Sequence, residues 1–148
     1  TQVLALEAIP CPKKVAKELE LSLGDLVVHL KRLRFIAREP ILIVSSYLPR
    51  HLVPEIEKCD FTHKSLYQVL RSDYDLQIHS IRRGIEAVAA NENEARLLQV
   101  KPGAPLLQIE STSYISSGQP MEYYAAKRRG DRTRFEFELS ASSHVELA

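Results

Sequence analysis

Residues 22–35 read SLGDLVVHLKRLRF, and residues 101–114 repeat this stretch in altered form as KPGAPLLQIESTSY. Gly24 and Gly103 take the same place in the two copies, where each indicates a turn followed by a strand rich in apolar residues. Residues 16–28 align without gaps on residues 95–107, and this segment also contains a short helical pattern ahead of the turn. Two copies of a helix, a turn and a strand are therefore predicted.

Each copy is predicted to continue into a second strand and so to form a β-hairpin. Pro40 and Pro120 open these second strands. The four hairpin strands are expected at residues 26–35, 41–49, 106–115 and 120–128. This arrangement predicts an α+β fold with a mostly antiparallel sheet, flanking helices and an internal pseudo-repeat, and it places a cleft where the two copies meet.

The remaining elements extend the sheet and its helices. Pro12 suits the first position of a short helix, and Asn91 with Glu94 matches the capping box of another. Gly84 interrupts an Ile- and Val-rich run, which suggests a bulge or bend within a long strand. Further strands are expected at residues 1–9, 76–90 and 134–139, and a further helix in the stretch SLYQVLRSDY at residues 65–74.

Composition limits the classes of protein to which the chain can belong. Its 148 residues are 45% hydrophobic, which fits one globular domain. The formal charge of +1 provides no basic field that would hold the domain to DNA by itself. Two cysteines outside any CxxC pattern indicate reduced thiols and a cytoplasmic location, and no apolar run is long enough to span a membrane. Because it begins with threonine, the chain is expected to be part of a longer protein.

Arg32 and Arg34 are the first candidate binding residues. They lie two apart in a predicted strand, so their side chains leave the same face about 7 Å apart, a spacing at which two guanidiniums can hold one phosphate or carboxylate. Val28 and Leu30 share that face, which favours partial burial. The alternative is a solvated sheet face or an ion pair with a neighbouring carboxylate.

Two further segments carry candidate polar groups. In the strand at residues 120–128, Glu122, Tyr124 and Arg128 share one face and could contact a polar ligand, although an ordinary surface strand with a cross-strand ion pair remains the alternative. Ser65 lies in the first turn of its helix, where backbone N–H groups favour an anion, and the alternative there is a simple helix cap.

Motifs for metal or nucleotide chemistry are missing from the sequence. The five histidines show no metal-ligand spacing, and the chain contains no GxSxG, P-loop or GxGxxG pattern. No cofactor and no metal are therefore expected.

Taken in order, six stretches resemble a known family. They are VAKELELSLGD, HLKRLRF, EPILIVSSYLP, SLYQVL, GIEAVAANENEARLLQVKPGAPLLQIESTSY and GQPMEYYAAKRRGDRTRF. Together they run over residues 15–135 and resemble the UTRA domain, the effector-binding half of HutC-type regulators within the GntR family of bacterial transcription factors. The resemblance implies a chorismate-lyase-like fold, a ligand-binding and dimerisation domain over residues 1–148, a homodimer, and a DNA-binding winged helix-turn-helix domain that precedes this chain.

The resemblance also assigns roles to individual residues. It implies that Arg32, Arg34 and Ser65 hold a phosphate, that Glu122 contacts the polar body of the ligand, and that the partner is a small anionic effector such as a phosphorylated sugar. Members that read amino-sugar phosphates commonly have a glutamate at Val44 and a tyrosine at Arg128. The hypothesis that follows is an effector without an amine, bound by a regulator that is more often a repressor than an activator.

Two other functions are compatible with the same residues. One is a lyase, because the related enzyme fold also uses arginines and a glutamate around a small dicarboxylate; a single well-placed carboxylate argues against it. The other is a dimerisation module without a ligand, in which Arg32 and Arg34 would face solvent or a salt bridge. A non-enzymatic sensor domain is the prediction.

Overall fold

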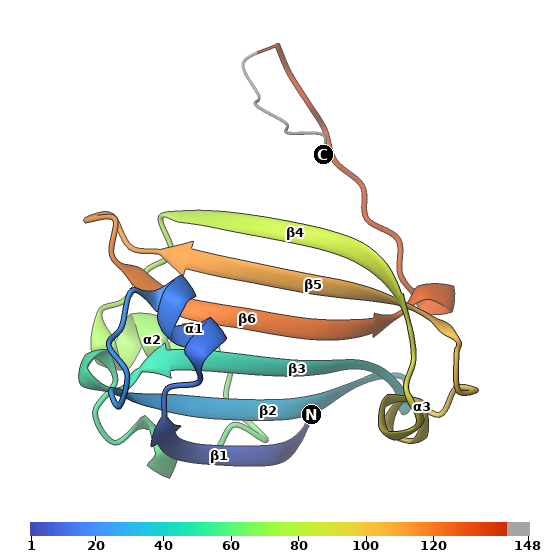
Figure 1. Ribbon diagram of the computed structural model, residues 1–148, viewed down its shortest axis with the longest axis horizontal. Coiled ribbons are helices and arrows are strands. Elements are labelled where there is room, and N and C mark those ends of the chain that lie inside the picture. Colours follow the sequence, from blue (N-terminus) through green and yellow to red (C-terminus); the bar gives the residue numbers. More distant parts are fainter. Residues whose placement is uncertain (142–148) are drawn as a thin grey trace.

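The protein forms one antiparallel sheet of six strands in the order β1-β2-β3-β6-β5-β4, with helices on both of its faces (Figure 1). The computed structural model describes residues 1–141. The strands are β1 (Gln2–Pro10), β2 (Leu26–Ile36), β3 (Glu39–Pro49), β4 (Ser80–Ala89), β5 (Pro105–Tyr114) and β6 (Pro120–Arg129). The helices are α1 (Lys13–Leu19), α2 (Leu66–Tyr74) and α3 (Glu92–Leu98), with short 3₁₀ helices at Arg50–Leu52, Ile56–Lys58 and Gly130–Arg132.

The internal pseudo-repeat is present in the order of the elements. The series β1, α1, β2, β3 returns as β4, α3, β5, β6, and the sheet is joined at its centre where β3 pairs with β6. Ser45 lies five residues after Pro40 and Ala125 five residues after Pro120, and Ser45 and Ala125 pair with each other. Equivalent residues pair across the join, so a pseudo-twofold axis passes through the middle of the sheet.

The two copies also agree in backbone conformation. The residue that caps the end of α1 is Glu20, with φ 55°, and the residue that caps the end of α3 is Gln99, with φ 56°; both are left-handed. The turns that follow contain Gly24 at φ 89° and Gly103 at φ 83°. Glycine accepts this conformation without the steric cost that a Cβ atom adds. This explains why each copy has a glycine in the turn before its strand, β2 or β5.

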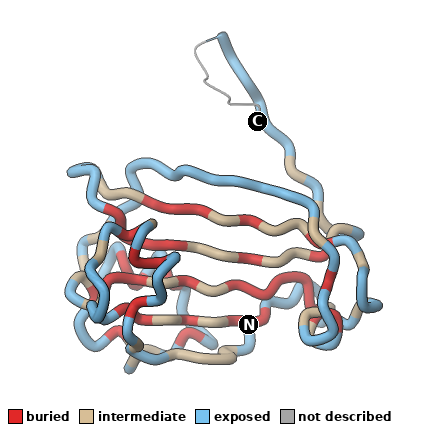
Figure 2. Tube along the Cα trace, viewed as in Figure 1, coloured by how far each residue is buried: buried red, intermediate tan, exposed pale blue. Residues whose placement is uncertain are grey.

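The hydrophobic core occupies both faces of the sheet, since neighbouring residues of a strand point to opposite sides. Helix α2 lies behind the sheet in Figure 1, where Leu66, Val69 and Leu70 pack with Val28 and Leu30 of β2. Helices α1 and α3 pack on the opposite face, and the strand residues that they cover are Val27, Leu33, Ile43, Leu106 and Tyr123. The four inner strands are accordingly the most buried, whereas β4 is exposed along nearly its whole length (Figure 2).

The predicted strand at residues 134–139 is wrong, because no strand forms between residues 133 and 140. This segment leaves the sheet beyond β6, and both edges of β6 are already paired, to β3 and β5. The free edges of the sheet belong to β1 and β4 at its two ends. Of the segment's alternating apolar residues, Phe135 packs against a core cluster of the sheet, whereas Phe137 is 71% and Leu139 65% exposed.

The predicted strand at residues 76–90 is shorter than expected and has no bulge. It begins at Ser80, because the Leu76 amide donates to the carbonyl of Leu70 at the end of α2 and the Leu76 side chain packs against the α2 cluster. The β4–β5 ladder runs without a register shift through the pair of Gly84 with Glu110. Helices α1, α2 and α3 lie where they were predicted, and none of the described helices is long and apolar enough to cross a membrane.

Candidate functional site

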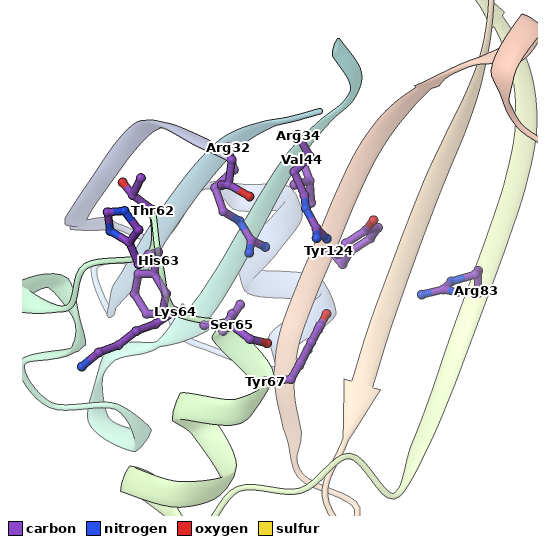
Figure 3. Close-up of a pocket in the computed structure, with 13 residues that line it drawn as sticks. Arg32, Arg34, Val44, Thr62, His63, Lys64, Ser65, Tyr67, Arg83 and Tyr124 are labelled. Carbon is purple, nitrogen blue, oxygen red and sulfur yellow. The ribbon is translucent and has the colours of Figure 1, made fainter. Parts of the chain in front are cut away.

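A cavity of about 360 Å³ opens between the sheet and the beginning of α2 (Figure 3). Both copies of the repeat contribute to it: β2 and β3 come from the first, and β4 and β6 from the second. Residues 61–67, which lead into α2, form another wall. The cleft expected where the two copies meet is therefore present, and α2 bounds it on one side.

Arg32 and Arg34 extend from β2 into this cavity, and Figure 3 shows both guanidiniums pointing toward the beginning of α2. Arg32 is only 7% exposed, and its Nε is buried without a hydrogen-bond partner among residues 1–141. Burial and the neighbouring charge of Arg34 lower the pKa of Arg32. Neither arginine makes an ion pair within the described residues, so the salt-bridge alternative is not what the structure shows.

Ser65 faces the same cavity from the N-cap position of α2. Its backbone is extended, with φ −77° and ψ 131°, and its carbonyl accepts from the Val69 amide at 3.0 Å. The hydroxyl makes no capping hydrogen bond, so the expected alternative of a side-chain cap does not apply. The first N–H groups of a helix have no partner inside it, and the helix dipole adds partial positive charge there. This end of α2 is suited to an anion.

Asp60 fixes the loop that leads to Ser65. Its carboxylate accepts from the Thr62 amide at 2.9 Å and lies 2.8 Å from Nδ1 of His63, while its carbonyl accepts from the Lys64 amide at 3.2 Å. These contacts hold residues 62–64 along the rim of the cavity. The Lys64 side chain is exposed, and Figure 3 shows it extending away from Arg32 and Arg34.

Glu122 lies behind the cavity wall. It is fully buried, and its Oε1 accepts from the Tyr67 hydroxyl at 2.8 Å. Burial raises the pKa of Glu122, although Ser46, Tyr67 and the charge of Arg32 act in the opposite direction. Burial and the proximity of Glu122 also raise the pKa of Tyr67. Tyr67 lines the cavity, whereas Glu122 supports it from beneath.

Arg128 is not brought into the cavity. Arg34 pairs with Leu42, which pairs with Arg128, so both arginines lie in one row across the sheet. The guanidinium of Arg128 lies 5.9 Å from the ring of Phe135. The structure thus places Arg32, Arg34 and Ser65 together, Glu122 next to them, and Arg128 outside the lining.

The lining residues that sequence reasoning missed include Lys64, Tyr67 and Arg83. Arg83 extends from β4, where it pairs with Ser111, and Ser111 pairs with Tyr124 on the next strand. The register of β4 against β5 would have placed Arg83 in the cavity. The sequence did not give this register, because it suggested a bulge or bend at Gly84.

The cavity has a strongly positive lining. Arg32, Arg34, Lys64 and Arg83 all contribute to it, and within the described part of the chain no aspartate or glutamate lines it. The described residues also contain no group of three or more His, Cys, Asp or Glu side chains arranged to hold a metal ion. Hydrogen-bond donors and positive charge are what this arrangement offers, and both suit a small anion.

Solved structures with the same fold include ligand-binding domains of transcription factors. One is the ligand-binding domain of a protein assigned to the GntR family of transcriptional regulators from Bordetella bronchiseptica, with a TM-score of 0.88 and 28% identity over 94% of this chain and 90% of that one. The effector domain of PhnF from Mycobacterium smegmatis shares the fold, with a TM-score of 0.88 and 21% identity over 95% and 86% of the two chains. The fold is that of regulator effector domains.

Sequence comparison narrows this class to one family. The UTRA domain model matches residues 1–134, and the chain belongs to the UTRA domain family. Its relatives include the HTH-type transcriptional regulator GmuR of Bacillus subtilis, 28% identical over 89% of this chain and 55% of the relative. Another is the HTH-type transcriptional repressor NagR of Bacillus subtilis, 31% identical over 72% of this chain and 43% of the relative.

The chain spans about half the length of these curated relatives. They and the fold neighbours are transcriptional regulators and their effector domains rather than enzymes, which agrees with the prediction of a non-enzymatic domain. The UTRA resemblance found in the sequence is confirmed.

Proposed function

We propose that this chain is the effector-sensing domain of a bacterial GntR-family regulator of the HutC type, and that its cavity binds a small anionic metabolite such as a phosphorylated sugar. Arg32 is the observation that carries the proposal. Its guanidinium is buried with an unpartnered Nε, next to Arg34 and facing the free N-terminus of α2. A buried donor without a partner costs free energy, and an anion in the cavity would remove that cost.

The regulatory part of the proposal is supported by the relatives. Their names describe HTH-type regulators, and those of NagR and of a fructoselysine utilization operon regulator from Escherichia coli specify repressors. We therefore propose a repressor, with DNA bound by a separate N-terminal domain and not by this one. Effector binding would shift the equilibrium between the geometries that bind and release DNA.

The effector is proposed to lack an amine. Val44 lines the cavity, so a branched apolar side chain stands where a carboxylate would be needed to pair with an ammonium group. Isothermal titration calorimetry with glucose 6-phosphate and glucosamine 6-phosphate tests this. Glucose 6-phosphate should bind with the higher affinity, and tighter binding of the amino sugar would contradict the proposal.

A thermal-shift screen tests the sensor function itself. Sugar phosphates, phosphonates and small carboxylates are added to the domain, because a ligand that binds only the folded state raises its melting temperature. A shift that is lost in Arg32→Ala and Arg34→Ala but kept in Arg96→Ala would support the proposal. Arg96 is the matched control, because it lies on α3 outside the cavity. No shift with any compound would favour a dimerisation module without a ligand.

The domain is further proposed to act as a homodimer in the bacterial cytoplasm, as the family resemblance implies. Sedimentation velocity measures its mass in solution directly. A species of twice the chain mass is expected, and a monomer over the whole accessible concentration range would overturn this part of the proposal.

A further inference from the structure

Arg83 places a second positive group in the cavity, away from the pair on β2. It extends from β4, at the edge of the sheet, and Figure 3 shows it on the other side of Tyr67 and Tyr124 from Arg32 and Arg34. From β2 to β4 there are four interstrand steps, which at about 4.8 Å each amount to about 19 Å along the sheet. One phosphate between Arg32 and Arg34 does not reach both ends of this cavity.

The position of Arg83 follows from the register of the sheet. Paired residues in neighbouring strands share a face, and Leu30, Ser46, Tyr124, Ser111 and Arg83 form one continuous row. Leu30 packs with the α2 cluster, so this row lies on the cavity side. Arg83 therefore faces the same space as the β2 arginines, although it belongs to the other copy of the repeat.

Two contacts hold the Arg83 guanidinium in place. Its Nε donates to the Ser111 hydroxyl at 2.8 Å, and its Cζ lies 5.8 Å from the centre of the Tyr124 ring. Both partners are neutral, so neither cancels the charge. In the described part of the chain, Arg83 makes no ion pair and its two terminal nitrogens donate no hydrogen bond to a protein group. They are free to bind a planar carboxylate in a bidentate manner.

We propose that the effector carries two separated anionic groups: a phosphate held by Arg32, Arg34 and the N-terminus of α2, and a carboxylate held by Arg83. This inference rests on the proposed function and defines its ligand class as phosphorylated sugar acids. A cavity of about 360 Å³ has the size of sites that hold small molecules of this kind.

Two compounds that differ at one carbon test the second anionic group. Gluconate 6-phosphate ends in a carboxylate where glucitol 6-phosphate ends in a hydroxymethyl group, and their affinities are measured by isothermal titration calorimetry. Because a charge-assisted hydrogen bond is lost with the carboxylate, gluconate 6-phosphate should bind about ten to a hundred times more tightly. Arg83→Gln should remove most of this preference, because it should weaken the binding of gluconate 6-phosphate far more than that of glucitol 6-phosphate.

Control variants separate charge from structure. Arg82→Gln removes an equal charge from the neighbouring residue, which points to the opposite face of β4, and it should retain the full preference. Arg83→Lys retains the charge and should keep an intermediate preference. Circular dichroism and the melting temperature establish that each variant is folded before titration.

The outcomes also distinguish this inference from the function on which it rests. The second anionic group is overturned if the wild type binds both compounds with equal affinity, or if the preference persists in Arg83→Gln. The sensor function still stands in either case, provided that Arg32→Ala abolishes the binding of both compounds. Failure of the wild type to bind either compound counts against the phosphorylated sugar acid and, if the wider screen is also negative, against the sensor function.

Discussion

Glu122 is a fully buried carboxyl group whose pKa is raised above its ordinary value of 4.5, chiefly by burial. A raised pKa in the folded state means that the native protein binds this proton more readily than the unfolded chain does. The contribution of Glu122 to stability is therefore fully present below about pH 4.5 and is lost as pH rises through the raised pKa.

The pKa of Glu94 is shifted in the opposite direction: hydrogen bonds with the Asn91 amide and Lys127 lower it despite partial burial.

The two carboxyls predict pH dependences of opposite sign. Relative to wild type, Glu122→Gln should gain free energy of unfolding as pH is raised from 4.5, because the amide mimics the protonated acid. Glu94→Gln should lose free energy of unfolding relative to wild type mainly as pH is raised toward 4.5 from below, because there the folded protein already holds the charged carboxylate while the unfolded chain still binds the proton. Urea unfolding of the ligand-free domain at several pH values measures both. Parallel curves for the two variants would contradict the assignment.

Among single residues, the sequence predicted those whose position depends on a local pattern. Arg32 and Arg34 share a face because strand residues alternate, and Ser65 precedes an amphipathic stretch. Arg83 was missed, because its place in the cavity depends on which residue of a distant strand it pairs with. The contact of Glu122 with ligand stays a prediction; in the structure Glu122 does not line the cavity and accepts a hydrogen bond from Tyr67, which does.

Among the secondary elements, α2 and α3 begin in chemically different ways. Asn91 accepts from the Glu94 amide at 2.8 Å and the Glu94 carboxylate accepts from the Asn91 amide at 3.0 Å, which closes a capping box. Ser65 makes no such bond. Asn91→Ala should therefore lower the free energy of unfolding by about 0.5–2 kcal/mol, and Ser65→Ala by less than about 0.5 kcal/mol.

Ligand affinity should show the reverse order for these two variants. Ser65→Ala is expected to weaken phosphate-ligand binding, and Asn91→Ala to leave it unchanged, because Asn91 lies outside the cavity lining. Urea unfolding and calorimetry on the same two proteins give all four values. A large loss of stability in Ser65→Ala would show that its hydroxyl serves the helix instead of the ligand.

The glycines of the repeat make a second prediction about the elements. Gly24 and Gly103 have positive φ, and a Cβ added at either would meet no atom within 4 Å, so the cost of alanine comes from the backbone alone. Gly24→Ala and Gly103→Ala should each lower the free energy of unfolding by about 1–2 kcal/mol. Gly84 is the matched control: it has equal space and no positive φ, so Gly84→Ala should not destabilise the domain. Unequal costs for Gly24 and Gly103 would contradict the equivalence of the two turns.

For the domain as a whole, the pseudo-twofold scaffold carries an asymmetric site. In the alignment of the two copies, Ser111 takes the position that Arg32 has in the first copy. Arg32 faces the cavity directly, and Ser111 accepts a hydrogen bond from Arg83. The stretch between β3 and β4, which contains α2, has no counterpart after β6 within the described residues, where the chain continues as a short 3₁₀ helix and an extended segment. One cavity is therefore built from two halves that share a backbone plan and differ in side chains.

Because β3 and β6 pair directly, the two halves should unfold in one transition. Circular dichroism and tyrosine fluorescence should report the same urea midpoint. A bound phosphate ligand at one hundred times its dissociation constant should raise the free energy of unfolding by about 2.7 kcal/mol for both probes, and Arg32→Ala should abolish this increase. Two separate midpoints would show that the halves fold independently.

The order of elements, the repeat and the arginine pair on β2 could be read from the sequence alone. They depend on turn residues, on residue periodicity and on similarity between segments, all of which are local properties of the chain. Only the tertiary structure decided that residues 134–139 form no strand, that Glu122 lies beneath Tyr67, and that Arg83 completes the cavity. These features depend on which strand edges are free and on the register between strands distant in sequence, because a side chain takes its environment from its neighbours across the sheet as well as from those along the chain.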